Sequence, residues 1–423
     1  MIINQWISEV MDITTAFLHG EMEEEVYMTV PEGLDLVEEG WDVNDDCVEL
    51  MQTIYGTRQA ARQYWKYFMA HMQQKGYKRT HADPCLLMKR DNNGTCIICV
   101  YVDDCLITGD KRAVEQAKLD IKSKFDVREL GPVDEYIGCN IKKIDDSKIK
   151  LEQPDMIKKI KKEFGKDVEH MRPSETPMGP GIAVQRPTEA DELISKEDQT
   201  RYRSAVGMLL YLVKHSRPDL SNAVRELTKV MDGATKEHVK LLHRVINFVI
   251  LTEDRGLIME PKKSAMAIVE AMSNSDFAGD KDNRRSITGY LIKLYGCVIA
   301  WKSKQQGGVC LSSSEAEYYA ISEATTELLF IKNVLTFLEV EFEVPMILQA
   351  DNNGAIFLAN NASSGGRTKH VDTRVHFIRD LVQEEKTLKI NYVNTEENES
   401  DTFTKNTDNG TFWKHTSKYM TDE

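Results

Sequence analysis

Residues 95–104, Thr-Cys-Ile-Ile-Cys-Val-Tyr-Val-Asp-Asp, decide the fold. The stretch begins as a continuous run of apolar and β-branched residues, which is typical of a strand buried on both faces. It ends in two adjacent carboxylates, Asp103 and Asp104. Like charges side by side at the end of a buried strand are costly unless a cation neutralises them. A plain turn after the strand is the alternative explanation, because aspartate is common in turns.

A third carboxylate, Asp12, lies in a second short β-like segment, residues 9–14. Mg²⁺ prefers carboxylate and phosphate oxygens. Three carboxylates can hold two such ions about 4 Å apart, an arrangement that serves nucleotidyl transfer. In that reaction one ion activates the attacking hydroxyl and the other stabilises the leaving pyrophosphate. The pattern therefore predicts a two-metal site.

The composition sets limits on the class of protein. The chain has 423 residues, enough for two or three domains of about 150 residues. With 41% hydrophobic and 29% charged residues it is globular rather than wholly disordered. No apolar run reaches the roughly 18 residues of a membrane span, and the N-terminus lacks the basic region of a secretory signal. We therefore expect a reducing compartment, the cytoplasm or the nucleus, with the eight cysteines as thiols.

The negative charge is concentrated at the N-terminus. The formal net charge is -14, from 54 basic and 68 acidic residues. Residues 1–57 contain 14 acidic residues and no Lys or Arg, so the remainder of the chain holds 54 of each sign. Nucleic-acid-binding proteins usually show a basic patch. A nucleic-acid partner of this chain would therefore have to be held by local basic faces.

The motifs around these carboxylates resemble those of a known family. Residues 11–20, around Asp12, resemble the first palm motif of copia-type (Ty1/copia) retrotransposon reverse transcriptases, and residues 101–104 match that family's metal-binding motif. Further matching segments are Val26-Tyr27-Met28, Pro31-Glu32-Gly33, residues 55–62, residues 202–207, Leu210-Tyr211-Leu212 and Arg217-Pro218-Asp219. The resemblance implies that Asp12, Asp103 and Asp104 hold two Mg²⁺ ions per active site. It also implies an RNA or DNA primer–template and deoxynucleoside triphosphates as partners, and no membrane.

The resemblance also implies roles for the residues after Asp12. Phe17 matches the aromatic position that blocks a ribose 2′ hydroxyl and so selects deoxynucleotides. A buried core aromatic is the alternative explanation for this residue. The backbone of Thr15 and Ala16 would lie near the triphosphate.

Two features depart from the family pattern. Thr57 and Ala61 stand where the family usually has Leu and Pro, which puts the geometry of the template–nucleotide loop in doubt. The family's finger subdomain precedes the first palm motif, and Asp12 lies only eleven residues from the start. Phosphoryl transfer depends mostly on positioning and electrostatics. We therefore expect weak or no polymerisation from this chain alone.

Residues from about 265 onward resemble the RNase H domain of the same elements. Matching segments are residues 276–280, Arg284-Arg285-Ser286, Gly289-Tyr290, residues 301–304, residues 311–318 and Arg367 through His370. Such domains bind an RNA–DNA hybrid and hold two Mg²⁺ ions with four carboxylates. By position, three of the four would be Glu317, Asp351 and Asp401.

The fourth carboxylate is replaced by an amide. Asn274 occupies its position, and a neutral amide offers only one oxygen to a metal. Asp276 lies two residues further on the same strand face and is the candidate substitute, although it is displaced by nearly 7 Å along the strand. We therefore expect impaired RNase H activity. Glu317 has a local alternative role in a Ser314–Glu317 capping box, and Asp351 has one as a helix N-cap.

The periodicity predicts an α+β protein in three parts. We expect a reverse transcriptase palm without fingers at 1–145, a helical thumb and connection at 146–262, and an RNase H-like α/β domain at 263–423. Expected helices are residues 58–75, 202–214, 219–231, 235–252 and 314–339, and expected strands are residues 95–102, 267–273, 287–294, 297–303, 346–350 and 388–393. Thr108-Gly109-Asp110 is expected to form a turn.

Two functions fit this sequence. The first is an RNA-directed DNA polymerase with an RNase H-like domain. The second is a catalytically inactive retroelement relic, or a co-opted module that binds nucleic acid or protein. The intact Asp12, Asp103 and Asp104 favour the enzyme, whereas the missing fingers and Asn274 favour the relic. The sequence leaves the oligomeric state open.

Overall fold

The computed structural model describes residues 1–33, 46–360 and 372–422. The chain forms two compact units, residues 3–137 and residues 138–423. Both units combine helices with β-sheets, so the expected α+β class is confirmed.

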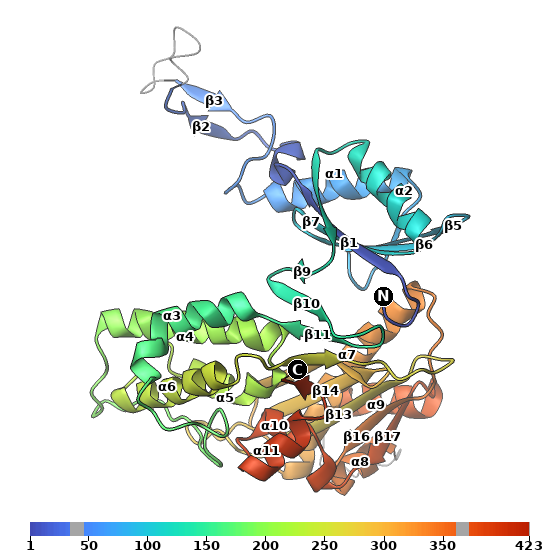
Figure 1. Cartoon of the computed structure of the whole chain (residues 1–423). Coiled ribbons are helices and arrows are strands. Elements are labelled where there is room, and N and C mark those ends of the chain that lie inside the picture. Colours follow the sequence, from blue (N-terminus) through green and yellow to red (C-terminus); the bar gives the residue numbers. More distant parts are fainter. Residues whose placement is uncertain (34–45, 361–371, 423) are drawn as a thin grey trace. The chain divides into compact units, whose positions relative to one another are not determined.

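The first unit is an antiparallel sheet with two helices on one face (Figure 1). Its strands lie in the order β4-β5-β6-β7-β1-β8. Their bounds are β1 Ile7–Ile13, β4 Lys78–Arg79, β5 Leu86–Asp91, β6 Gly94–Tyr101, β7 Asp104–Gly109 and β8 Val127–Pro132, and the helices are α1 Ala60–Gln74 and α2 Lys111–Lys122. Four short elements complete the unit, the 3₁₀ helix η1 Ala16–His19 and the strands β2 Tyr27–Thr29, β3 Cys47–Glu49 and β9 Glu135–Tyr136.

The helix α1 follows from its apolar spacing. Tyr64, Phe68 and Met72 recur every four residues and are all buried against the sheet. Fully burying a large apolar side chain contributes roughly 1.5–3 kcal/mol, so this face alone anchors the helix. Gly76 follows the helix with a φ of 89°, a left-handed conformation that glycine adopts without steric cost. The predicted helix and its stop are confirmed.

The predicted turn at Thr108 and Gly109 is wrong. Both residues belong to β7, which pairs with β6 and β1. Asp110 directly precedes α2, where aspartate is a favoured N-cap residue, but its side chain does not cap that helix. Its carboxylate instead accepts a hydrogen bond from the Thr95 backbone N–H at 2.7 Å. A competing backbone donor therefore uses the group that the sequence marks as a cap.

The N-terminal part of the second unit is mainly helical. Its helices are α3 Pro154–Val168, α4 Lys196–His215, α5 Ser221–Thr228 and α6 Lys236–Leu251, and they share one hydrophobic core. A small antiparallel sheet, in the order β18-β12-β11-β10, accompanies them. Its strands are β10 Cys139–Lys143, β11 Ile149–Glu152, β12 Gly256–Met259 and β18 Met420–Thr421. These strands are short and mixed in polarity, so the sequence pattern does not show them.

A buried arginine marks the break between α4 and α5. Arg217 is 0% exposed, and its guanidinium donates two hydrogen bonds of 2.9 Å to the Asp219 carboxylate. It also donates to the backbone oxygen and the hydroxyl of Thr252, at 3.1 and 2.9 Å. All this charge is paired, which is the condition for burying it. Pro218 then begins the 3₁₀ helix η3 Pro218–Leu220, so the predicted break is confirmed.

The rest of the second unit is built on a mixed sheet in the order β15-β14-β13-β16-β17. The strands β13, β14 and β15 are antiparallel, and β16 and β17 run parallel to β13. Their bounds are β13 Val269–Asp276, β14 Ile287–Leu294, β15 Cys297–Gln305, β16 Met346–Ala350 and β17 Leu388–Tyr392. The remaining elements are α7 Ser313–Phe337, α8 Asn353–Asn360, α9 Asp372–Arg379, η4 Asp380–Glu384, η5 Thr395–Glu397, α10 Asp401–Thr404 and α11 Asn409–Thr416.

The long helix α7 lies across this sheet (Figure 1). Its Ile321, Ala324 and Leu328 are fully buried in a core shared with β13, β14 and β16. The spacing of three and four residues that predicted this helix is the spacing of that buried face.

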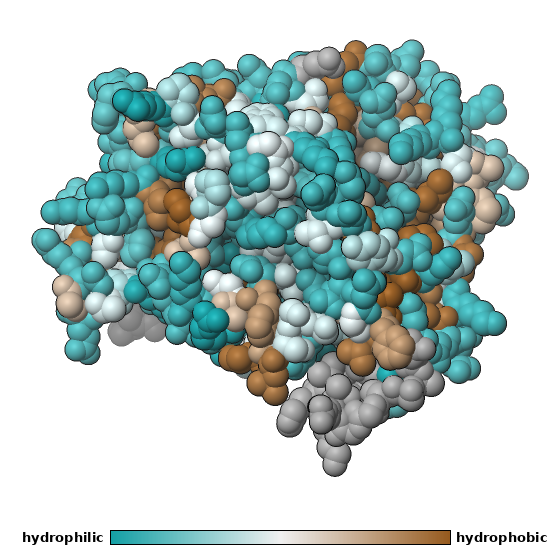
Figure 2. Space-filling model, turned by 90° about the horizontal axis from the view of Figure 1, so that it is seen from below, coloured by the Kyte–Doolittle hydropathy of each residue, from teal (hydrophilic) through white to brown (hydrophobic). Residues whose placement is uncertain are grey.

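The surface is mainly polar. On the face in Figure 2, hydrophilic residues predominate and hydrophobic ones gather in small separate patches. Within the described ranges, no helix combines the length and apolarity that crossing a bilayer demands.

Candidate active sites

The sheet of the first unit brings three aspartates together. Asp12 near the end of β1 is paired directly with Asp104 at the start of β7. Asp103 lies in the turn between β6 and β7, and its backbone oxygen accepts a hydrogen bond from the Ile13 N–H at 2.8 Å. Asp12, Asp103 and Asp104, hereafter the three aspartates of the first unit, therefore come from two strand ends and one turn.

The turn between β6 and β7 is strained. Tyr101 pairs with Asp104 across it, and Val102 has a φ of 56°. A β-branched residue in the left-handed region is an outlier, and such strain costs about 1–3 kcal/mol. It persists only where the surrounding structure enforces it. The hairpin thus holds Asp103 and Asp104 in place at the expense of local stability.

The three aspartates of the first unit repel one another. Partial burial raises the pKa of Asp104, and the negative charges of Asp103 and Asp12 raise it further. The structure gives none of the three carboxylates a hydrogen bond or an ion pair with a described residue. Their oxygens are therefore available to a cation.

The donor set fits Mg²⁺ in its chemistry. Carboxylate oxygens without competing partners are the ligands that this ion prefers. Across the described parts of the chain, however, no three acidic, His or Cys side chains already form a cluster close enough to hold a metal ion. The aspartates are neighbours in the sheet rather than a closed cage.

The residues after Asp12 form a short 3₁₀ helix. Thr15 precedes it with a φ of 52°, and Ala16 is fully buried. Phe17 is half-buried, with its ring centroid 5.0 Å from that of Tyr55 and 6.3 Å from that of Tyr64. Together with Tyr101, the last residue of β6, Phe17 also lines a pocket of about 480 Å³. Phe17 is therefore at the edge of the core and open to a pocket, which leaves its role in sugar selection a prediction.

The second candidate site lies in the second unit. Asn274 is near the end of β13, Glu317 is on the second turn of α7, Asp351 follows β16 and Asp401 begins α10. These four residues, hereafter the RNase H-like site, are linked by contacts and by their charges. The matching residues Arg367 through His370 lie outside the described residues.

Asn274 acts as a donor in this site. It is 5% exposed, and its Nδ2 donates to Asp401 Oδ1 at 2.5 Å and to Thr404 Oγ1 at 3.1 Å. Lys405 Nζ lies 2.9 Å from the same Asp401 oxygen. The Asn274 amide and the Lys405 ammonium group thus both occupy Oδ1 of Asp401, an oxygen that a metal ion at this site would need.

Only one of the two carboxylate oxygens of Glu317 accepts hydrogen bonds. Its Oε1 accepts hydrogen bonds from the Ser275 N–H at 2.8 Å and from the Ser275 hydroxyl at 3.0 Å. Its Oε2 is buried and has no hydrogen-bond partner among the described residues. Burial, followed by the negative charge of Asp351, raises the pKa of Glu317 to about 8. The side chain is therefore poised between its neutral and charged forms near neutral pH.

The local alternatives for Glu317 and Asp351 are wrong. Ser312, not Ser314, is the N-cap of α7, and its side chain accepts from the Glu315 N–H. Asn352 Oδ1, not Asp351, accepts from the Ala355 N–H at the start of α8. Neither Glu317 nor Asp351 caps a helix, so helix capping does not explain why an acidic residue stands at either position. Burial is the main cause that raises the pKa of Asp351.

Asp276, the proposed substitute for the missing carboxylate, ends β13. Burial raises its pKa, and the negative charge of Asp401 raises it further. With an amide at 274 and Asp401 already paired, the residues present do not fit a two-Mg²⁺ cage. Sequence reasoning missed Ser275, Thr404 and Lys405. The opposite charges of Asp401 and Lys405 at i and i+4 were a usable signal for one of them.

The comparisons with known proteins place the chain in a family. Residues 1–180 match the family model "Reverse transcriptase (RNA-dependent DNA polymerase)". The Pol polyprotein of transposon TNT 1-94 from Nicotiana tabacum is 34% identical over 403 residues, covering 94% of this chain and 29% of that polyprotein. This chain therefore spans less than a third of the length of that relative.

Two solved structures are similar at low scores. An RNase H1 isolated from compost covers 32% of this chain and 92% of its own, at 14% identity and a TM-score of 0.27. A foamy viral protease-reverse transcriptase in complex with dsDNA covers 92% of this chain and 68% of its own, at 10% identity and a TM-score of 0.21.

Residues 1–180 thus match the reverse transcriptase family. The chain belongs to the Pol polyproteins of copia-type retrotransposons.

Proposed function

We propose that this chain catalyses Mg²⁺-dependent nucleotidyl transfer on a primer–template, with Asp12, Asp103 and Asp104 as the metal-binding residues. The observation that carries the proposal is the direct pairing of Asp12 with Asp104 beside a turn that holds Asp103, with all three carboxylates unengaged. Two Mg²⁺ ions bound there would activate the primer 3′ hydroxyl and neutralise the leaving pyrophosphate.

The chain's own residues would position the substrates. We propose that Phe17, which borders the pocket beside Tyr101, excludes a ribose 2′ hydroxyl, and that the backbone of Thr15 and Ala16 lies along the triphosphate of an incoming deoxynucleotide. The three expected parts, the palm at 1–145, the thumb and connection at 146–262 and the RNase H-like domain at 263–423, belong to the same proposal.

Primer extension tests this function. The wild type should extend oligo(dT) on poly(rA) in Mg²⁺, even if slowly, and Asp103→Asn should abolish the extension. Asp134→Asn, which removes an exposed carboxylate outside the site, is the matched control and should extend like the wild type. Absence of extension from folded wild-type protein would refute polymerase activity and support the inactive relic or binding module.

The RNase H-like site favours a second function, binding of an RNA–DNA hybrid without cleavage. The supporting observation is that Asn274 and Lys405 together occupy the Asp401 oxygen. We expect the wild type to bind a labelled hybrid and leave its RNA strand intact in Mg²⁺. Cleavage that disappears in Glu317→Gln would contradict this expectation.

We also propose that the chain works in a reducing compartment, the cytoplasm or the nucleus. None of the eight cysteines, all of which lie in the described residues, forms a disulfide. Mass spectrometry of alkylated protein from cells should show all eight as thiols.

A further inference from the structure

A second pocket adjoins the RNase H-like site. It has a volume of about 310 Å³ and is lined by α5, by the loop that follows β13 and by the residues after α10. Asp276 and Lys405 belong to its wall, and these residues lie two and four positions beyond Asn274 and Asp401. We call it the anion pocket, because four basic side chains line it.

Cations dominate the wall of the anion pocket. Arg225, Lys281, Arg284 and Lys405 line it, against the two carboxylates of Glu226 and Asp276. Glu226 is already engaged, because Arg225 Nη2 lies 2.5 Å from its Oε1 and Lys229 Nζ lies 2.9 Å from its Oε2. In a chain with a net charge of -14, this concentration of positive groups is a local exception.

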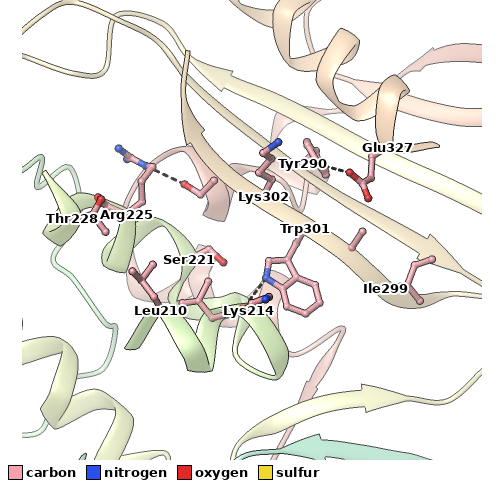
Figure 3. Close-up of a pocket in the computed structure, with 13 residues that line it drawn as sticks. Leu210, Lys214, Ser221, Arg225, Thr228, Tyr290, Ile299, Trp301, Lys302 and Glu327 are labelled. Carbon is pink, nitrogen blue, oxygen red and sulfur yellow. Dashed lines mark hydrogen bonds between the residues drawn. The ribbon is translucent and has the colours of Figure 1, made fainter. Parts of the chain in front are cut away.

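Arg225 has an unused donor. Its Nε donates to Ser303 Oγ at 3.0 Å, and its Nη2 donates to Asn222 Oδ1 at 2.7 Å. Its Nη1 is buried and has no hydrogen-bond partner among the described residues. Figure 3 shows Arg225 at the edge of a neighbouring pocket, with its guanidinium turned away from Trp301. A buried guanidinium donor without an acceptor is costly, and an anionic oxygen would satisfy it.

The two loop cations are also available. Lys281 and Arg284 are exposed, and the structure gives neither of them an ion pair with a described residue. Ala278 and Arg284 have φ values of 52° and 58°, so the loop that carries both cations is held in an unfavourable conformation. Three cationic groups, one from α5 and two from this loop, thus line one pocket without a full set of partners.

We infer that the anion pocket binds a backbone phosphate of a nucleic acid whose neighbouring phosphodiester lies at the RNase H-like site. The inference rests on the proposed function in that it takes nucleic acid as the partner. Lys405 connects the two places, because it lines the pocket and its Nζ lies 2.9 Å from Asp401 Oδ1. Arg225 lies on α5 in the helical part of the second unit, whereas Lys281 and Arg284 follow β13 of the mixed sheet. Both parts of this unit would therefore contact the same nucleic-acid strand.

Hybrid binding measured against salt tests the inference. The full chain is titrated with a fluorescent RNA–DNA hybrid in EDTA, as wild type and as the double variant Lys281→Ala/Arg284→Ala. Each phosphate that the protein no longer neutralises should reduce the slope of log K against log salt by about 0.9. We expect the slope of the double variant to fall by about 1–2 and its affinity to fall about tenfold at 0.1 M salt. Lys281→Glu, a single variant, should weaken binding in the same direction if the double variant folds poorly.

The control removes the same charge elsewhere. Lys196→Ala/Lys236→Ala changes two exposed lysines at the starts of α4 and α6, neither of which lines the anion pocket. It should retain the wild-type slope. Equal reductions in the two double variants, or no reduction in either, would refute the phosphate site while leaving nucleic-acid binding intact. Failure of the wild type to bind any hybrid would instead refute the nucleic-acid partner of the proposed function.

A free anion is the other source of a phosphate. Orthophosphate is therefore titrated into the wild type and the double variant by calorimetry. Binding of orthophosphate that requires Lys281 and Arg284, with hybrid affinity unchanged in the double variant, would show a site for free phosphate and overturn the inference.

Discussion

Replacing Glu317 by glutamine should stabilise the second unit at alkaline pH and not at acidic pH. Glu317 is 5% exposed, and its pKa is raised from an ordinary 4.5 to about 8. When folding raises the pKa of a carboxyl group, the charged form of that group destabilises the folded state. Below the pKa of the unfolded state the group is neutral and costs nothing. As the pH rises from that value to the pKa of the folded state, the protein loses stability. The charged form of Glu317 therefore opposes folding increasingly between pH 4.5 and pH 8.

The magnitude follows from linkage. One pKa unit corresponds to about 1.4 kcal/mol, so between about pH 5 and pH 8.5 the penalty grows by about 4 kcal/mol. Glutamine removes this penalty and still accepts from Ser275 through its amide oxygen. Its Nε2 would replace the unpartnered Oε2 with a buried, unpartnered donor, which costs about 1–3 kcal/mol at every pH. The variant should thus be slightly less stable at pH 5 and about 2 kcal/mol more stable at pH 8.5.

Urea unfolding in EDTA, followed by tryptophan fluorescence, measures both differences. Glu343→Gln is the matched control, because Glu343 is exposed and should change stability equally at the two pH values. A Glu317→Gln effect that stays constant across this pH range would refute the assignment of a raised pKa to this side chain.

Three further changes test other parts of the structure. Asn274→Asp should destabilise the protein in EDTA by about 3 kcal/mol, since it replaces a donor to Asp401 with a like charge. Mg²⁺ should then raise the melting temperature of this variant by more than it raises that of the wild type; an equal response of the two proteins would count against a latent metal site. Arg217→Ala should cost about 3–5 kcal/mol in urea unfolding, because it removes two hydrogen bonds of 2.9 Å to the buried Asp219 carboxylate and leaves that carboxylate only Arg255 Nε, at 3.6 Å. A decrease below about 1 kcal/mol would contradict the importance of the Arg217–Asp219 pair. Val102→Gly should raise the stability of the first unit by about 1 kcal/mol by relieving its left-handed backbone, and a decrease in stability would argue against strain in that turn.

The larger elements were predictable because their patterns are long. The run that ends at Tyr101 is β6, and the three- and four-residue spacing around Leu328 is the buried face of α7. The strand β18 was not predictable, because two residues carry no periodicity and pair only with a distant partner. The hydrogen-bond partners of side chains near helix starts were equally hard to predict. Asp110 and Glu317 both lie where a helix cap is expected, but the carboxylate of each accepts a hydrogen bond from the backbone N–H of a strand residue.

In the candidate sites, too, one part was predictable from the sequence and another was not. The convergence of Asp12 and Asp104 was expected from motif order, and their register pairing agrees with it. The environment of Asn274 was not predictable, since its partners Asp401 and Thr404 lie 127 and 130 residues away. The sequence shows that a carboxylate is missing from that position, but only the fold shows which groups fill its place.

The small sheet of the second unit can be completed only late in synthesis. Leu151 and Leu257 are neighbours across β11 and β12, and Leu257 pairs on its other side with Met420 in β18. A ribosome adding about 5–20 residues per second needs about 14–54 s to proceed from Leu151 to Met420. For much of that time one edge of β12 has no partner, and unpaired edges invite pairing with other chains. The contact order of this sheet therefore leaves an edge of β12 open to pairing with other chains until translation reaches β18.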